Sequence, residues 1–403
     1  MSTTASVDSR DSDHDRETPA TPASLVRGSR RLRVGILSSA PPTPCGLATF
    51  TTALGAALTR RGAEVGVVRV LDQSDGGGIG ELPVWAELIA RQANTRAPAL
   101  RALNSCDVVF VQHEYGLYGG RDGSDVLRVF EGLHVPVVSV LHTVLESPTR
   151  HQHDILNEVI RRSHHVVVMS AHAEKTLRSA NFVGATPLSI IPHGAELTFS
   201  DGRRVANARP TLLTWGLLGP GKGVEWVIDA LSMLGDLDPV PHYVVAGRTH
   251  PKVLAREGER YREMLQQRVL DNDVGHMVTF DDSYRDLVSL QALISSADVV
   301  VLPYDSKDQV TSGVLVDALA AGRPVIATAF PHALETLSEG AGIVVTQRDS
   351  VAIARAIRQV VVNHPLATSM ASAARVAAQS LSWDTVGETY ALIAEACVVK
   401  FSV

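Results

Sequence analysis

The sequence contains little cysteine, few aromatic residues and no long hydrophobic run. Its three cysteines, Cys45, Cys106 and Cys397, lie far apart among 403 residues, and no CxxC pair is present. We therefore expect neither a disulfide framework nor a cysteine zinc site, and a reducing cytoplasm is the expected location. No apolar run reaches the roughly 18 residues of a membrane-spanning helix. The polar N-terminus has no apolar core of a secretory signal, and peripheral contact with a membrane stays open.

The bulk composition is that of a globular protein with sizeable cores. Hydrophobic residues make up 45% and charged residues 20%, while aromatic residues make up only 5%. The net charge of −6 argues against a broad basic surface for nucleic acid, although a local basic patch stays open. A length of 403 residues favours two domains.

Changes in composition along the chain predict five segments. Residues 1–30 are rich in Ser, Thr, Asp and Arg and read as a disordered tail. An N-terminal domain follows over 31–200, and the polar stretch 201–210, DGRRVANARP, reads as a linker. A second domain is expected over 211–382. Residues 383–403 are expected to form a terminal helix that packs back towards the N-terminal domain.

Short apolar, β-branched runs alternate with amphipathic stretches in both domains. This alternation predicts α/β domains, each with a mostly parallel sheet covered on both faces. Two such domains in succession place a cleft between the carboxyl ends of two sheets, where ligands commonly bind. The predicted strands are Arg33–Ser38, Val65–Val70, Val108–Gln112, Val137–His142, His165–Met169, Ser189–Ile191, Thr211–Trp215, His242–Ala246, Met277–Phe280, Val299–Pro303, Pro324–Ala327 and Gly342–Val345.

The stretch WGLLGPGKGVEW, residues 215–226, nearly spells a nucleotide triphosphate loop. Gly216, four residues, Gly221 and Lys222 fit, but the next position holds Gly223, which has no hydroxyl for Mg²⁺. Pro220 removes a backbone N–H from a loop that works by donating them. A dinucleotide fingerprint also fails, since no GxGxxG follows the first strand. A glycine-rich turn, a helix N-terminus and a mobile ammonium can still bind a diphosphate; the alternative is a solvated lysine.

A second segment, DQVTSGVLVDALAAGRPVIAT at 308–328, follows the apolar run VVVLPYD. Thr311 or Ser312 reads as the cap of a helix over about Gly313–Ala321. Free N–H groups at this end can accept an anion. Asp317, one turn further in, could accept hydrogen bonds from ribose hydroxyls, although an exposed helix acid is the plainer interpretation.

These motifs resemble those of the family 4 retaining glycosyltransferases, which have the two-domain GT-B architecture. The family carries GRLxxxKG, then two glutamates separated by seven residues, then a small-residue helix ending in GxPVxA. This chain has GLLGPGKG at 216–223, then Gln309 with seven residues to Asp317, then GRPVIA at 322–327. The resemblance extends over nearly all of residues 31 to 403.

The resemblance implies a role for each matching position. Lys222, in the loop that Gly216 opens, would hold the diphosphate of a nucleotide sugar, and Gln309 would contact the donor sugar. Asp317 would bind the ribose. The phosphate would receive N–H contacts from Ser312, Gly313 and Val314.

Three positions depart from the family pattern. Leu217 stands where the family has an arginine that partners the lysine, and Arg248 is a candidate for the missing cation. Gln309 replaces a glutamate and loses its charge. Asp317 is one methylene shorter than the family's glutamate.

The N-terminal half adds candidates on loops after predicted strands. Gly46, in APPTPCGLATF, could let backbone approach the donor phosphates. The resemblance places His142 near the reacting sugar as a catalytic residue. An acceptor could contact residues of VQHEYGLYGG, namely His113, Glu114 and Tyr115. The pairs His151/His153 and His164/His165 are interpreted as core or solvated histidines, because no cysteine or HExxH accompanies them; no metal site is predicted.

The predicted activity is transfer of a hexose from a nucleoside diphosphate sugar to an acceptor hydroxyl. The resemblance implies retention of configuration and no required metal or cofactor. Epimerases and phosphorylases of similar architecture fit less well, because the former need differently placed carboxylates and the latter a lysine-bound pyridoxal phosphate. A nucleotide-sugar sensor without turnover stays open because of Leu217 and Gln309.

Overall fold

A computed structural model describes most of the chain. The described residues are 31–77, 80–180, 182, 184–199, 208–283, 285–305 and 311–401. The predicted tail at 1–30, most of the predicted linker and the predicted sugar contact Gln309 lie outside them.

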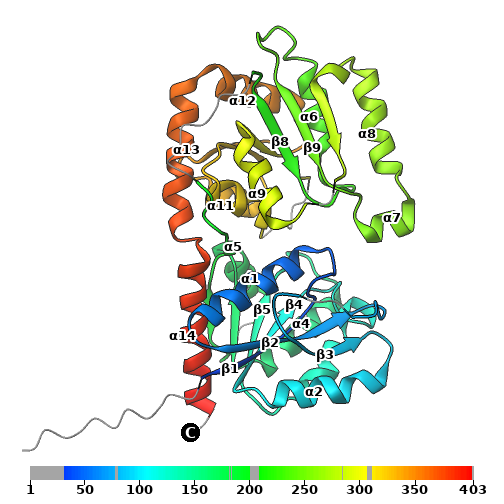
Figure 1. The fold of residues 1–403 in the computed structure, drawn as a ribbon, viewed down its shortest axis with the longest axis vertical. Coiled ribbons are helices and arrows are strands. Elements are labelled where there is room, and N and C mark those ends of the chain that lie inside the picture. Colours follow the sequence, from blue (N-terminus) through cyan, green and yellow to red (C-terminus); the bar gives the residue numbers. More distant parts are fainter. Residues whose placement is uncertain are drawn as a thin grey trace, which may run out of the picture. The chain divides into compact units, whose positions relative to one another are not determined.

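Within the described residues, seven parallel strands form the first sheet, in the order β3-β2-β1-β4-β5-β6-β7 (Figure 1). Most of these strands are buried on both faces, as their continuous runs of valine require. Their bounds are β1 Arg33–Ser38, β2 Glu64–Leu71, β3 Val84–Ile89, β4 Val108–His113, β5 Val137–Leu141, β6 His165–Val168 and β7 Leu188–Ile190. We call the segment that holds this sheet the N-terminal lobe.

Helices connect these strands and cover the sheet. Thr149 starts α4 with a capping box, since its hydroxyl accepts from the backbone of Gln152 while the Gln152 side chain accepts from the backbone of Thr149. The helices are α1 Gly46–Arg60, α2 Arg96–Asn104, α3 Val126–Phe130, α4 Arg150–Arg162 and α5 Ala171–Ser179, with short 3₁₀ turns η1 Ala93–Thr95 and η2 Arg121–Gly123.

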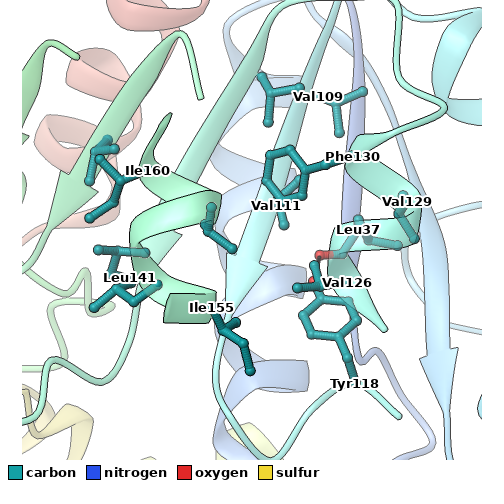
Figure 2. Packing of buried hydrophobic residues seen from close by; sticks show 14 of the residues in the cluster. Leu37, Val109, Val111, Tyr118, Val126, Val129, Phe130, Leu141, Ile155 and Ile160 are labelled. Atoms are coloured by element: carbon teal, nitrogen blue, oxygen red, sulfur yellow. Dashed lines mark hydrogen bonds between the residues drawn. The ribbon is translucent and has the colours of Figure 1, made fainter. Parts of the chain in front are cut away.

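One face of the first sheet packs against α3 and α4. Figure 2 shows Val109 and Val111 of β4 and Leu141 of β5 lying near Phe130 of α3 and Ile155 of α4. All of these side chains are at most 7% exposed. Burial of each such side chain stabilises the folded state by about 1.5–3 kcal/mol. This packing holds in place the strands whose ends carry the candidate residues.

Six parallel strands of the described region form the second sheet, in the order β10-β9-β8-β11-β12-β13. Each strand is short and mostly apolar. Their bounds are β8 Thr211–Trp215, β9 His242–Ala246, β10 Val278–Asp281, β11 Val299–Leu302, β12 Val325–Thr328 and β13 Gly342–Val345. We call the segment that holds this sheet the C-terminal lobe.

The helices of the second half include one that returns to the first lobe. In α14, Gly387 sits so close to Ala57 of α1 that a Cβ would lie 2.6 Å from the Ala57 methyl group, and the Tyr390 ring meets Phe110 edge-on. The helices are α6 Val224–Leu231, α7 Pro251–Glu257, α8 Arg260–Asp271, α9 Leu287–Ser296, α10 Gly313–Ala320, α11 Pro331–Thr336, α12 Ser350–Val362, α13 His364–Gln379 and α14 Trp383–Phe401, with η3 at Gly275–Met277.

The predicted α/β class is confirmed, and each sheet reverses its strand order beside its first strand. In the first sheet β1 lies between β2 and β4, and in the second β8 lies between β9 and β11. Loops that follow the strands on either side of such a switch point diverge and leave a crevice at the carboxyl ends. Lys222 follows β8, and His113 is the last residue of β4, so both lie beside such a switch point. His142 follows β5, one strand further along the first sheet.

Candidate functional site

The glycine-rich loop between β8 and α6 is shaped by a contact with the loop after β11. Gly223 has a left-handed φ of 69°, and a Cβ on it would lie 1.8 Å from the carbonyl oxygen of Pro303. Only glycine fits such a position. The hydroxyl that a nucleotide triphosphate loop needs here is therefore excluded by packing.

Lys222 lies beside an aromatic ring from the neighbouring loop. Its Nζ is 4.5 Å from the centroid of the Tyr304 ring, and Tyr304 is 1% exposed. Burial lowers the pKa of Lys222, and within the described residues no carboxylate forms an ion pair with it. An ammonium held against a ring without a counter-ion is well suited to receive an anionic ligand.

The loop after β9 crosses the glycine-rich loop. Leu218 N donates to Arg248 O at 2.8 Å, and His250 N donates to Leu218 O at 2.8 Å. The Arg248 side chain is exposed, and its Nε donates to the carbonyl of Asp282 at 2.9 Å. Burial and the charges of Lys252 and Lys222 lower the pKa of His250. Lys252 is thus a further cation on this side of the site.

Helix α10 begins at Ser312, one of the two caps expected. The Ser312 hydroxyl accepts from Leu315 N at 3.2 Å, and Ser312 N donates to His332 Nδ1 at 2.9 Å. The first turn carries no acidic residue. The next two amides, of Gly313 and Val314, stand at the positive end of the helix, which is the arrangement that favours an anion.

The two predicted phosphate segments meet in the structure. A Cβ on Gly216 would lie 3.9 Å from Cγ2 of Val314, so the start of the glycine-rich loop lies beside the first turn of α10. One turn further along, Asp317 is half-buried. Burial raises the pKa of Asp317 to about 7, so its carboxylate is costly to keep charged.

The structure places Gly46 and His142 on the first lobe at strand-to-helix connections. Gly46 is exposed as the first residue of α1, and a Cβ there would meet no atom within 4 Å. His142 directly follows β5, and its Nε2 lies 2.6 Å from Gln112 Oε1. The His142 ring meets Phe50 edge-on. Burial lowers the pKa of His142 to about 3, with a smaller contribution from His193, so it is neutral at pH 7.

The three predicted acceptor contacts differ in exposure. His113 is 1% exposed and Tyr115 is 9% exposed, and the two rings meet edge-on. Burial lowers the pKa of His113 to about 4. Glu114 is half-buried and accepts a hydrogen bond from the Thr143 hydroxyl. Glu114 is therefore the most accessible of the three side chains.

Sequence reasoning missed three residues that line this region: Tyr304, His193 and His332. A Cβ on Gly313 would lie 3.0 Å from His193 Nε2. His332 is 4% exposed and receives the Ser312 amide. A signal was available for two of them, because Tyr304 and His193 each follow an apolar strand by two or three residues, where ligand contacts concentrate.

The histidine pairs do not assemble a metal site in the described part of the chain, where no group of three metal-binding side chains occurs. His151 Nδ1 is 2.8 Å from Asp122, and the His153 ring packs on Phe182. His164 Nδ1 accepts from Val137 N, and His165 Nε2 bonds to the Ser189 hydroxyl. Each histidine thus has separate contacts of its own.

A cavity of about 560 Å³ lies elsewhere, between α5 and α11. Glu335 of α11 borders it and accepts from the first amides of α5, Ala171 N at 2.9 Å and His172 N at 3.2 Å. The cavity contains none of the predicted donor or acceptor residues. The loops at the carboxyl ends of the strands carry these predicted residues, and we take them as the candidate site.

Two family profiles cover most of the chain. The profile "Glycosyl transferases group 1" matches residues 199–377, and "Glycosyltransferase Family 4" matches residues 44–199. The chain belongs to the family 4, group 1 glycosyltransferases. The first profile spans both phosphate segments of this glycosyltransferase, and the second spans Gly46, His113 and His142. No curated protein matches the chain.

Solved structures show that this glycosyltransferase has the GT-B fold. HepE of Anabaena, solved with UDP and glucose, is 19% identical with a TM-score of 0.71, over 91% of this chain and 100% of its own. Sucrose-phosphate synthase of Thermosynechococcus elongatus is 18% identical with a TM-score of 0.74, over 92% and 100%. A glycosyltransferase of Rickettsia africae is 14% identical with a TM-score of 0.72, over 91% and 99%. At these identities the likeness concerns the fold.

No helix among the described residues of this glycosyltransferase combines the length and the hydropathy needed to cross a bilayer.

Proposed function

We propose that this glycosyltransferase moves a hexose from a nucleoside diphosphate sugar to an acceptor hydroxyl, with retention of configuration and without a metal. One observation carries the proposal. The ammonium of Lys222, which has no carboxylate partner among the described residues, and the amides of Gly313 and Val314 at the start of α10 belong to two segments that lie side by side at Gly216 and Val314. The HepE structure with bound UDP-glucose supports a donor of this class.

In the proposed reaction the C1–O bond to the diphosphate breaks as the acceptor oxygen bonds to C1. The acceptor attacks on the face from which the diphosphate departs, which retains the configuration without a protein nucleophile. The leaving phosphate oxygen takes the acceptor proton, so no protein base is required. Negative charge grows on the leaving group, where Lys222 and the amides of Gly313 and Val314 stabilise it. The Ser312 amide, a further predicted phosphate contact, instead donates to His332 Nδ1. Removing one such group typically costs about 10²–10³-fold in rate.

The other predicted roles rest on the resemblance to the family. Asp317 binds the ribose hydroxyls, and Gln309, outside the described residues, contacts the sugar. His142, which is neutral at pH 7, hydrogen-bonds the sugar or the acceptor in this proposal. Because Gly223 lacks a hydroxyl, this loop cannot recruit Mg²⁺ in the manner of a nucleotide triphosphate loop.

A turnover assay tests this function. The full chain is incubated with UDP-glucose and with GDP-mannose over a panel of sugar and polyol acceptors, and nucleoside diphosphate release is measured with and without EDTA. We expect release that EDTA does not reduce, a fall of about 10²–10³-fold in Lys222→Ala, and no change in the control Lys400→Ala, which alters an exposed lysine of α14. The anomeric configuration of the product, read by NMR, tests retention.

A nucleotide-sugar sensor is the second candidate, favoured by Leu217 at the position of the family arginine. Tight donor binding without release of nucleoside diphosphate over the whole acceptor panel would support the sensor and contradict the transferase.

A further inference from the structure

Four buried or half-buried histidines are neighbours of one another, and two of them, His193 and His332, lie at the start of α10. His193 is close enough to lower the pKa of both His142 and His332, and His113 likewise affects His142. His113 ends β4, His142 and His193 lie in the loops after β5 and β7, and His332 lies in α11. The candidate site thus contains a cluster of neutral imidazoles that the proposed reaction uses only in part.

His193 is held in one orientation by its surroundings. Phe50 meets the His193 ring edge-on at 5.1 Å, and Trp383 lies 6.2 Å away. The following Gly194 is pressed against Trp383, since a Cβ on it would lie 2.5 Å from the indole. The imidazole therefore cannot turn freely.

The hydrogen bond of His193 decides which nitrogen carries the proton. Nδ1 lies 2.8 Å from the carbonyl oxygen of Gly194, and a carbonyl only accepts, so Nδ1 carries the hydrogen. In the neutral ring Nε2 then holds a lone pair. That atom is 3.0 Å from the place a Cβ of Gly313 would take, so it stands at the start of α10.

A lone pair at this place conflicts with a phosphate oxygen bound to the α10 amides. Moving the proton to Nε2 would leave Nδ1 and the Gly194 oxygen as two facing acceptors at 2.8 Å. Only the imidazolium donates on both sides. We infer that His193 takes up a proton from solvent at Nε2 when the diphosphate of the donor binds, and that the resulting imidazolium supplies the positive charge missing at Leu217.

This inference rests on the proposed donor site. Burial lowers the pKa of His193 in the free protein to about 4, so the ring is neutral at pH 7 before binding. A bound dianion favours the charged ring and raises its pKa. Among the described residues, the titratable groups that interact with His193 are His142 and His332, and Phe50 and Trp383 contribute uncharged rings. Asp317 also lies on α10 and titrates near pH 7.

Calorimetry of donor binding tests the inference. UDP-glucose and GDP-mannose are suitable probes because their diphosphate diesters do not titrate between pH 5 and 8. Each is titrated into the full chain at pH 6.5 in buffers of different ionisation enthalpy, which reports the protons taken up. We expect uptake that approaches about one proton per donor as the pH is lowered from 8 to 6, and a donor affinity that rises over the same range.

Variants test whether His193 is the residue that takes up the proton. His193→Gln keeps a polar side chain and should abolish uptake while weakening binding at pH 6.5. Asp317→Asn and the exposed control His134→Gln should retain the proton uptake. Uptake that survives in His193→Gln, or is lost in Asp317→Asn, overturns the assignment. If His193→Gln does not fold, the wild-type protein still decides, since donor binding without proton uptake contradicts the inference. Failure of both probes to bind would instead contradict the proposed function.

Discussion

The ammonium of Lys222 lies 4.5 Å from the centroid of the Tyr304 ring, and the two residues come from neighbouring loops of the C-terminal lobe. The ring attracts the cation without neutralising it, unlike a carboxylate. Such a contact is worth about 0.5–2 kcal/mol. We therefore expect Tyr304 to act as a positioning residue for Lys222, the proposed diphosphate ligand.

Two substitutions of Tyr304 distinguish the contribution of its ring from that of its hydroxyl. We expect Tyr304→Phe to retain kcat/KM for the donor, because the ring face is unchanged. Tyr304→Leu should lower kcat/KM by about 2–30-fold, the range that loss of the cation–π contact implies. Kinetics of nucleoside diphosphate release and thermal unfolding of both variants provide the measurement. Equal losses in the two variants would show that the ring does not position Lys222.

Replacement of Gly223 tests why this loop departs from a nucleotide triphosphate loop. Gly223→Ser restores the hydroxyl but drives a Cβ to 1.8 Å from Pro303 O at a left-handed φ. We expect the free energy of unfolding to fall by about 2–4 kcal/mol, without any Mg²⁺-dependent nucleotide hydrolysis. Gly235→Ser is the matched control, since a Cβ there meets no atom within 4 Å. Denaturant unfolding that shows equal stability for both variants would contradict the packing argument.

The carboxylate of Asp317 should cost stability at neutral and higher pH. Burial raises its pKa to about 7 from an ordinary 3.8, so the folded protein binds this proton more tightly than the unfolded chain. The free energy of unfolding therefore falls as the pH rises from about 4 to about 7.

Asp317→Asn removes that cost. We expect no gain in stability below pH 4 and a gain of about 1–2 kcal/mol above pH 7, which is less than about 1.4 kcal/mol per pKa unit because the side chain is half exposed. Donor binding should weaken in the same variant, since the ribose loses a charged acceptor. Urea unfolding over pH 4–8 checks the first effect. A stability difference that does not change with pH would contradict it.

Most of the fold could be predicted from the sequence because most of its strands are short, largely apolar runs. The runs at Arg33–Ser38, Thr211–Trp215 and His242–Ala246 match β1, β8 and β9 to the residue. The missed strand is β3, whose residues are mostly half-buried at the edge of the sheet. Its sequence, VWAELI, mixes polar and apolar residues and lacks the continuous valine pattern.

Only those parts of the candidate site that lie in short sequence motifs could be predicted from the sequence. Lys222 and Ser312 stand in recognisable loops at strand and helix ends. Tyr304, His193 and His332 act through contacts with residues 20 to 120 positions away, and no short pattern records such pairings. The absence of a hydroxyl at Gly223 was visible in the sequence, but its cause, the Pro303 carbonyl, depends on how two loops pack.

Thermal unfolding in the presence of nucleotides tests the central claim most directly. UDP, GDP, UDP-glucose and GDP-mannose are compared with the corresponding nucleosides, in wild type and in Lys222→Ala. A ligand at 100 times its Kd stabilises the folded state by about 2.7 kcal/mol, which gives a readable shift. We expect at least one of these nucleoside diphosphates or nucleotide sugars to raise the Tm of wild type, whereas the corresponding nucleoside does not. Lys222→Ala should lose most of this shift. If none of the four raises the Tm of wild type, the proposed donor site is contradicted.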